Sequence, residues 1–342
     1  MVGNNQEQLL KLNDLLREQI DTLEEREDDG LNDASVGVFV SIDLTNSTAF
    51  KIQYKDLWKK VIPAYYNAVQ RAFGVGEYHE VGLEITDIVH LWKFVGDEVL
   101  LYAPIYEAKS IEQIVFAAND VVSSINRRIL ENIEGDLSES DLRAIECDLG
   151  AKGTVWIGLY SKNPNATGRN MVYEEKSAVN SGAPKRIDFL GADIDEGFRI
   201  SKFAVKKRVL VSPLLAGVIN ATHDSKGGLI QTQYVITSYQ TLKGVWKNRK
   251  VPIIMYFPAG IQDSFEYDEL EHDTFCAGIR SDFKQYVLVD TNNINKIDNI
   301  LQSVELYATR EEIVDTLRSE EYVRKRVTVT RRLPSKIVSE LE

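Results

Sequence analysis

The sequence predicts an α+β fold in which an antiparallel sheet carries helices on one face. Short apolar runs rich in Val, Ile and Phe are bounded by turn residues, which indicates strands, and amphipathic stretches with helical periodicity lie between them. The two kinds of element do not alternate in a regular βαβαβ order. A regular order would favour a parallel sheet, so its absence favours antiparallel strands.

The N-terminal half begins with a predicted helix and then enters the sheet. Over residues 4–27, Leu9, Leu12 and Leu16 lie near heptad spacing, which indicates a helix packed on its own domain or a short dimer contact. Apolar periodicity then predicts a strand over 36–43, a helix over 55–73, strands over 84–92 and 98–102, and a helix over 110–129.

The second half follows the same logic and ends in a hairpin. The expected elements are strands over 146–149 and 154–159, a long polar loop over about 160–185, a strand over 186–190, a helix over 194–203, a strand over 208–211, a helix over 213–219, and a hairpin over 231–238 and 251–257. We therefore divide the chain into an N-terminal helix (1–35), a central domain (36–258) and an extension (259–342). The extension contains a strand-like segment at 285–289 and a helix near 294–304.

Composition excludes several function classes. The net charge of −12 argues against a general nucleic-acid binder, and we interpret the basic run within 324–332 as a solvated edge strand. Cys147 and Cys276 are the only cysteines and lie far apart, so we expect neither a disulfide framework nor a zinc site. The polar start and the lack of a long apolar stretch predict neither a secretory signal nor a membrane span, and a cytoplasmic protein fits these features.

Two aspartates stand where strands end. Asp43 closes an apolar strand and precedes a small polar turn that includes Thr48, and Asp97 lies in the turn between two predicted strands. Either residue alone is ordinary turn chemistry. Together they form a pattern that can hold two divalent cations. The backbone N–H groups of the turn after Asp43 can cradle a phosphate where the next helix begins.

Four segments in this order resemble the motifs of class III adenylate and guanylate cyclases. Segment 39–48 (FVSIDLTNST) resembles the first metal-binding motif of that family, and segment 93–97 (KFVGD) resembles the second. Segment 188–199 (DFLGADIDEGFR) has the spacing of the residues that read the base, orient the ribose and stabilise the transition state. Leu242-Lys-Gly244 followed by 251–257 resembles the closing hairpin. The resemblance spans residues 36–258 and implies a ferredoxin-like βαββαβ core and a nucleotidyl cyclase (lyase) activity.

The resemblance assigns roles to individual residues. Asp43 and Asp97 are expected to ligate two Mg²⁺ or Mn²⁺ ions per site, with the Ile42 carbonyl as a further ligand. Arg199 is expected to stabilise charge on the α-phosphate. Asp195 stands where the family usually has Asn, so it can accept a bond from the ribose but cannot donate one. Lys243 or Lys247 is expected to hold the pyrophosphate end, and the sequence leaves the choice between these lysines open.

Lys93 and Asp188 match the base-selecting pair of the family. The Lys–Asp combination is associated with adenine, whereas guanine is typically read by Glu and Cys. Lysine only donates and an ionised aspartate only accepts, and adenine, uracil and cytosine all present a neighbouring acceptor and donor. Pocket size must then separate purines from pyrimidines. Phe50 and Tyr54 are candidates to narrow the pocket, although both residues could equally be core aromatics.

The overall layout is also similar to that of the bacterial pyrimidine cyclases of anti-phage signalling systems. This resemblance implies a homodimer with two composite sites that makes cyclic UMP or cyclic CMP, and we favour UTP over CTP as the substrate. The charge and the lack of a long apolar stretch lead us to expect no nucleic-acid and no membrane partner. The product would activate a separate effector. Three alternatives remain: a cytidylate cyclase making cyclic CMP, an adenylate cyclase making cyclic AMP, and an inactive cyclase-fold module that binds a nucleotide without turnover.

Overall fold

The computed structural model describes residues 35–75, 89–133, 135–161, 169–174, 187–222, 233–257, 294–303 and 305–319. The helix expected over 4–27, the strand-like segment at 285–289 and the basic run within 324–332 lie outside the described residues, as does the first part of the strand expected over 84–92.

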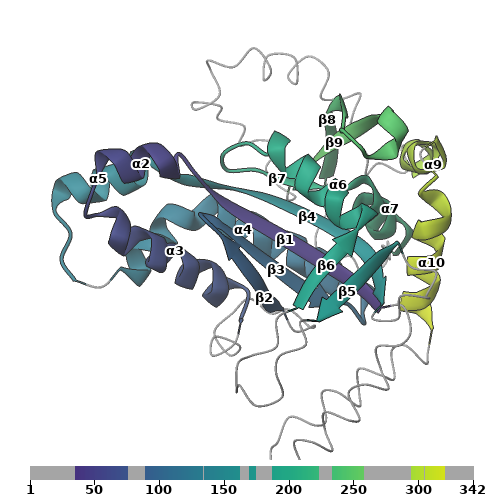
Figure 1. The fold of residues 1–342 in the computed structure, drawn as a ribbon, viewed down its shortest axis with the longest axis horizontal. Helices are drawn as coiled ribbons and strands as arrows, with labels where there is room; N and C mark the ends of the chain where they lie inside the picture. Colours follow the sequence, from purple (N-terminus) through teal and green to yellow (C-terminus); the bar gives the residue numbers. More distant parts are fainter. Residues whose placement is uncertain are drawn as a thin grey trace, which may run out of the picture.

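The described strands form one sheet (Figure 1). Its central order is β2-β3-β1-β4-β7-β9-β8, and a β5–β6 hairpin is attached to β4. The strands are β1 (Ser35–Thr45), β2 (His90–Val95), β3 (Glu98–Pro104), β4 (Gly150–Ser161), β5 (Asn170–Glu174), β6 (Ile187–Gly191), β7 (Val209–Val211), β8 (Gln233–Thr241) and β9 (Lys250–Phe257). The sheet is mixed instead of purely antiparallel, because β4 pairs in parallel with both β5 and β7.

The first part of the chain forms the expected βαββαβ core. β1 leads through α2 (Ser47–Gln53) and α3 (Trp58–Ala72) to the β2–β3 hairpin, and α4 (Ala108–Asn132) and α5 (Glu139–Asp148) lead to β4. These four strands lie in the order β2-β3-β1-β4, with β1 paired antiparallel to β3 and β4. The ferredoxin-like α+β fold expected from the sequence is therefore confirmed.

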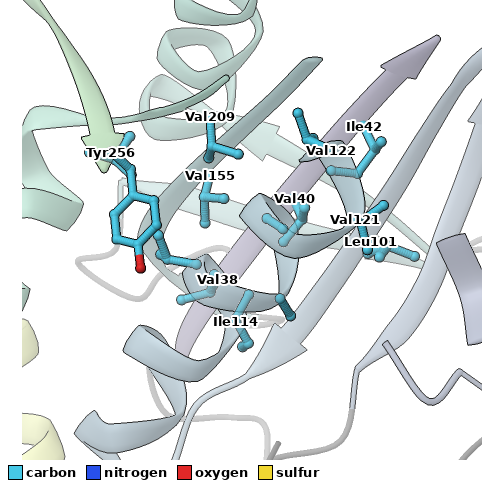
Figure 2. Close-up of a cluster of buried hydrophobic side chains, with 14 of the residues drawn as sticks. Val38, Val40, Ile42, Leu101, Ile114, Val121, Val122, Val155, Val209 and Tyr256 are labelled. Atoms are coloured by element: carbon cyan, nitrogen blue, oxygen red, sulfur yellow. The ribbon is translucent and has the colours of Figure 1, made fainter. Parts of the chain in front are cut away.

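Side chains along β1 point alternately to the two faces of the sheet, and the aliphatic ones lie on the face covered by α3 and α4. Val38, Val40 and Ile42 belong to the main core, where they meet Val121 and Val122 of α4 (Figure 2). Side chains on one strand point alternately to the two faces, so the residues between them turn the other way. Ser41 and Asp43 thus lie on the face opposite α3 and α4.

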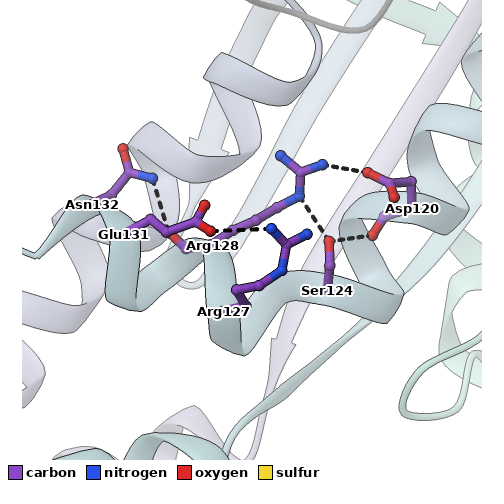
Figure 3. A network of polar contacts seen from close by, with 6 residues as sticks. All are labelled: Asp120, Ser124, Arg127, Arg128, Glu131 and Asn132. Carbon is purple, nitrogen blue, oxygen red and sulfur yellow. Dashed lines mark hydrogen bonds and ion pairs between the residues drawn. The ribbon is translucent and has the colours of Figure 1, made fainter.

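The polar side of α4 explains why such a long helix is stable on the outside of the core. Arg128 donates to Ser124 at 2.8 Å and pairs with Asp120, and Arg127 pairs with Glu131 at 3.1 Å (Figure 3). Residues four or eight apart lie on the same side of a helix, so these contacts occupy one side while the apolar stripe packs on the sheet.

One helix lies on the other face of the sheet, which corrects the expectation that all helices share one face. α6 (Ala192–Ile200) packs over β4, where Phe39, Trp156 and Phe189 form a separate aromatic cluster. A Cβ on Gly197 would lie 2.2 Å from the Trp156 ring, so only glycine lets this helix approach so closely. This approach brings α6 to the same face as Asp43.

Two local expectations are wrong. Residues 146–149 were expected to form a strand but include the end of α5, whose start is fixed by a capping box between Ser138 and Asp141. The expected loop over 160–185 contains β5, which pairs with β6 from Asn170↔Gly191 to Glu174↔Ile187.

Part of the predicted extension belongs to the main core. α9 (Ile294–Ser303) and α10 (Tyr307–Arg318) pack beside α7 (Pro213–Thr222) at one end of the molecule (Figure 1). Leu301, Leu306 and Ile313 are fully buried in the same cluster as the strands of the sheet. These helices are therefore not a separate unit. Among the described helices, none combines the length and apolarity that a membrane span requires.

Candidate active site

Asp43 and Asp97 lie at neighbouring strand ends. Asp43 is opposite Glu98 in the β1–β3 register, and Asp97 occupies the β2–β3 turn. The Leu44 N–H donates to the Asp97 carbonyl at 3.2 Å, which ties this turn to the end of β1. Gly96 permits the tight turn because its φ of 65° suits glycine. The structure thus brings together the two carboxylates singled out in the sequence.

Each of these carboxylates has a lysine beside it. Lys152 of β4 lies 3.1 Å from Asp43, and Lys51 of α2 lies 3.9 Å from Asp97. Ser47 also donates a hydrogen bond to Asp97. The sequence interpretation missed Lys152, because its place opposite Asp43 follows from the β1–β4 register, which the sequence pattern did not give.

The carboxylates form a cluster whose negative charges oppose one another. Burial raises the pKa of Asp43, and the charge of Asp97 adds to this effect while Lys152 opposes it. Burial likewise raises the pKa of Glu98, to which Ser41 donates at 2.5 Å. A cation bound between these carboxylates would reduce their mutual repulsion and favour their ionised forms.

The donor chemistry of this cluster fits Mg²⁺ or Mn²⁺. Magnesium is commonly held by one or two carboxylates, with substrate phosphate oxygens and water completing its shell. Asp43 and Asp97 supply two such carboxylates, and Asp43 lines a small pocket of about 130 Å³ with Lys152 and Lys202. Within the described ranges, no group of three or more His, Cys, Asp or Glu side chains is arranged to hold an ion.

The remaining residues predicted near the first motif have varied surroundings. The Ile42 carbonyl, predicted as a metal ligand, accepts a hydrogen bond from the buried Tyr65 hydroxyl at 2.7 Å. Thr48 is exposed on α2. Phe50 is only 2% exposed and packs on Tyr54, whose hydroxyl donates to Asp148 at 2.7 Å. Phe50 is thus placed in the core, which was the other interpretation left open by the sequence.

Lys93 and Asp188 form an ion pair on the face opposite α3 and α4. The Lys93 ammonium lies 2.8 Å from Asp188, although the two residues are distant in the chain. It also lies 4.3 Å from the centre of the Trp92 ring, and the Phe189 N–H donates to Asp188 at 3.0 Å. Both side chains are partly exposed, so a ligand could reach the donor and the acceptor together.

A second pocket, of about 460 Å³, is formed between α6 and the β8–β9 turn. Asp195 and Lys247 both line it. Its other lining residues are Arg169, Gly191, Ala192, Gly244, Val245, Trp246, Arg249 and Glu305. Lys247 lines this pocket and Lys243 does not, although both side chains are exposed.

Arg199 lies one helical turn after Asp195 on α6. A Cβ on Gly244 would lie 3.9 Å from its guanidinium, so the arginine approaches the β8–β9 turn. Its Nε is buried and has no hydrogen-bond partner within the described part of the chain. An unsatisfied buried donor is costly unless another group, such as a bound anion, completes it.

Several solved cyclase structures are similar to the chain. The guanylyl cyclase Cya2 is 14% identical, with 69% of this chain and 97% of that chain covered and a TM-score of 0.44. The adenylyl cyclase CyaB from P. aeruginosa is 13% identical, with 66% and 94% covered and a TM-score of 0.42. The guanylate cyclase domain of RhGC from Catenaria anguillulae, in complex with GTP, is 17% identical, with 66% and 96% covered and a TM-score of 0.37. No family model and no curated protein matches the sequence.

The sequence interpretation also missed a buried acidic residue that is bonded to the lining of the second pocket. Glu196 is 2% exposed and accepts a hydrogen bond from the Trp246 indole at 2.6 Å. Asp193, also buried, pairs with Arg169 at 3.0 Å and accepts from Asn170 at 2.8 Å. Acidic residues on a short helix are normally exposed, so nothing in the sequence pattern indicated this network.

Glu196 should make the protein less stable as the pH rises. Burial, reinforced by the charge of Asp193, raises the pKa of Glu196 from 4.5 to about 8, against the opposing effects of Trp246 and Arg169. The folded state therefore keeps a proton that the unfolded state releases. This stabilising contribution is complete below about pH 4.5 and is lost as the pH rises through about 8.

Glu196→Gln removes this titration but retains an acceptor for Trp246. Relative to this variant, the free energy of unfolding of the parent should fall by roughly 2 kcal/mol between pH 6 and pH 8, as measured by urea unfolding. Parallel pH profiles for the two proteins would contradict the assignment of a raised pKa to Glu196.

Proposed function

We propose that this chain is a nucleotide cyclase that converts a pyrimidine nucleoside triphosphate, UTP in the first place, to a 3′,5′-cyclic nucleotide and pyrophosphate. The observation that carries the proposal is the meeting of Asp43 and Asp97 at adjacent strand ends. In this reaction the ribose 3′-oxygen forms a bond to the α-phosphorus as the bond to the pyrophosphate leaving group breaks, and the 3′-hydroxyl loses its proton.

Each residue of the candidate site has a separate role in this proposed reaction. Asp43 and Asp97 would hold two Mg²⁺ or Mn²⁺ ions, which lower the pKa of the ribose 3′-hydroxyl and neutralise phosphate charge when bound. Arg199 donates to the α-phosphate oxygens as negative charge builds there, using a guanidinium whose Nε lacks a partner in the described structure. Asp195 accepts a bond from a ribose hydroxyl, and Lys247 in the same pocket binds the departing phosphates.

The Lys93–Asp188 pair supports recognition of a base with an adjacent acceptor and donor. Uracil fits when Lys93 donates to O4 and Asp188 accepts from N3–H; cytosine fits with N3 and its amino group. In the free protein the two side chains satisfy each other. A base that replaces this contact must supply both an acceptor and a donor, which favours bases with a complementary edge. Guanine also has such an edge, at O6 and N1–H, so it is disfavoured only by the family pattern, in which Glu and Cys typically read guanine.

The distribution of residues within one subunit supports a homodimer with composite sites. Asp43 lines one pocket, whereas Asp195 and Lys247 line another, to which Asp43 does not contribute. Two copies related by a two-fold axis would place the carboxylates of one subunit against Lys93, Asp188 and Arg199 of its partner, and the symmetry would generate two equivalent sites.

The cellular role that follows from this product is signalling. We propose that cyclic UMP made by this enzyme serves as a second messenger in antiviral, anti-phage defence. It would do so by activating a separate effector protein. This role rests on the layout similarity to pyrimidine cyclases described above.

The base can be decided by incubating the purified protein with Mn²⁺ and each of ATP, GTP, CTP and UTP. Products would be separated by chromatography and identified by mass. We expect cyclic UMP as the main product. Cyclic CMP or cyclic AMP as the main product would replace UTP by that nucleotide. Absence of any cyclic product, in protein shown to be folded, would favour the inactive nucleotide-binding module.

A further inference from the structure

Glu196 occupies an unusual position for a carboxyl group. It lies on α6 between Asp195 and Arg199, is 2% exposed, and directs Oε2 to the Trp246 indole N–H at 2.6 Å. Its other oxygen, Oε1, has no hydrogen-bond partner within the described residues. An apolar side chain of similar size would avoid the cost of burying this group, so simple packing does not account for it.

Trp246 is one of the residues through which the β8–β9 turn contacts the rest of the protein, together with the buried Leu242 and Val245. Its ring contacts both the main core and the cluster that contains Leu242 and Val245. Trp246 and Lys247 have φ values of 54° and 51°, a left-handed conformation that non-glycine residues seldom adopt. Such a conformation persists only where the surroundings hold it.

This turn conformation determines where Lys247 lies. Lys247 lines the pocket with Asp195, directly after the residue that is bonded to Glu196. The Glu196–Trp246 hydrogen bond therefore connects the helix that carries Asp195 and Arg199 to the turn that carries Lys247. Lys247 also pairs with Glu305 at 3.1 Å, but both of these side chains are largely exposed and such a pair orients little on its own.

We propose that Glu196 is a positioning residue, whose hydrogen bond to Trp246 fixes the β8–β9 turn against α6 and so holds Lys247 where it meets the triphosphate. The inference deepens the proposed function and rests on it. It predicts a specific kinetic effect, because Lys247 lies on the turn and depends on the bond, whereas Asp195 and Arg199 are on α6 itself. Loss of the bond should weaken binding of the phosphates more than it slows the chemical step.

Three variants test this positioning role. Glu196→Leu removes the acceptor and fills the space, Glu196→Gln retains an acceptor, and Trp246→Phe removes the donor. We expect Glu196→Leu and Trp246→Phe each to raise KM for the nucleotide by about tenfold, because small misplacements of binding groups have effects of this size or larger. We expect kcat to change by less than about threefold in both variants. Glu196→Gln should remain within about twofold of the parent in both parameters.

The double variant Glu196→Leu with Trp246→Phe separates a direct bond from two independent defects. If the two residues act through one hydrogen bond, KM of the double variant should not exceed that of the single variant with the higher KM. If their effects are independent, the two increases in KM should multiply. A KM for Glu196→Leu equal to that of the parent, or a rise in KM that Glu196→Gln shares, would overturn the proposal.

Binding of inorganic tripolyphosphate with Mn²⁺, measured by calorimetry, distinguishes this inference from the proposed function. The three single variants should rank in tripolyphosphate affinity as they do in KM. If the parent forms no cyclic nucleotide, the cyclase proposal fails on its own. Equal affinity of the parent and Glu196→Leu for tripolyphosphate, or binding by neither protein, would overturn the positioning role.

Discussion

Asp97→Asn is expected to lower the rate of cyclic nucleotide formation by about 10³-fold, the largest effect of any single change considered. The amide has nearly the same shape, and its oxygen can still accept the hydrogen bond from Ser47. What it loses is the negative charge beside Asp43 that would attract a divalent cation. The fold should therefore survive while activity is lost.

The measurement is kcat as a function of Mn²⁺ concentration for the parent and for Asp97→Asn. Asp56→Asn is a matched control, since it makes the same substitution at an exposed carboxylate that pairs with Lys59. The control should retain the activity of the parent. An Asp97→Asn enzyme that cyclises at the parental rate across the Mn²⁺ range would exclude Asp97 as a metal ligand.

Arg199→Met should lower kcat by about 10²- to 10³-fold, comparable with the loss of other positioned groups that stabilise transition-state charge. The methionine fills most of the space but provides no positive charge. Because the Arg199 Nε is buried without a hydrogen-bond partner in the described structure, its removal should leave the thermal stability unchanged or raise it. Activity is thus expected to fall without a loss of thermal stability.

Steady-state kinetics and thermal unfolding of the same protein preparation test this expectation. Arg143→Met is a suitable control, because Arg143 is an exposed arginine paired with Glu139 in the adjacent turn of α5. If Arg199→Met lost activity only in proportion to a fall in melting temperature, a structural role for the arginine would explain the result better than a role in catalysis.

The core elements of the fold were predictable because their sequence patterns are strong. The run of residues 36–43 has the length and the β-branched content of a buried strand. The resemblance of its last residues to a known motif indicated that Asp43 belongs to the site. The sequence also predicts the pairing of Lys93 with Asp188, through a family pattern and not through periodicity. Their 2.8 Å contact is consistent with that pairing.

The features that could not be predicted depend on tertiary contacts. The place of α6 on the far face of the sheet follows from the fit of Gly197 against Trp156, which no local pattern encodes. The short β5 is defined by pairing with β6, so its sequence looked like a loop. Glu196 could be recognised only once the turn around Trp246 had been placed over it.

The docking of α9 and α10 on α7 bears on where this chain can be divided. Leu301, Leu306 and Ile313 complete the same core as the sheet. A fragment ending at residue 258 would therefore expose hydrophobic surface to water and would be prone to self-association. The smallest portion suited to crystallisation or to grafting onto another protein thus reaches at least Ser319.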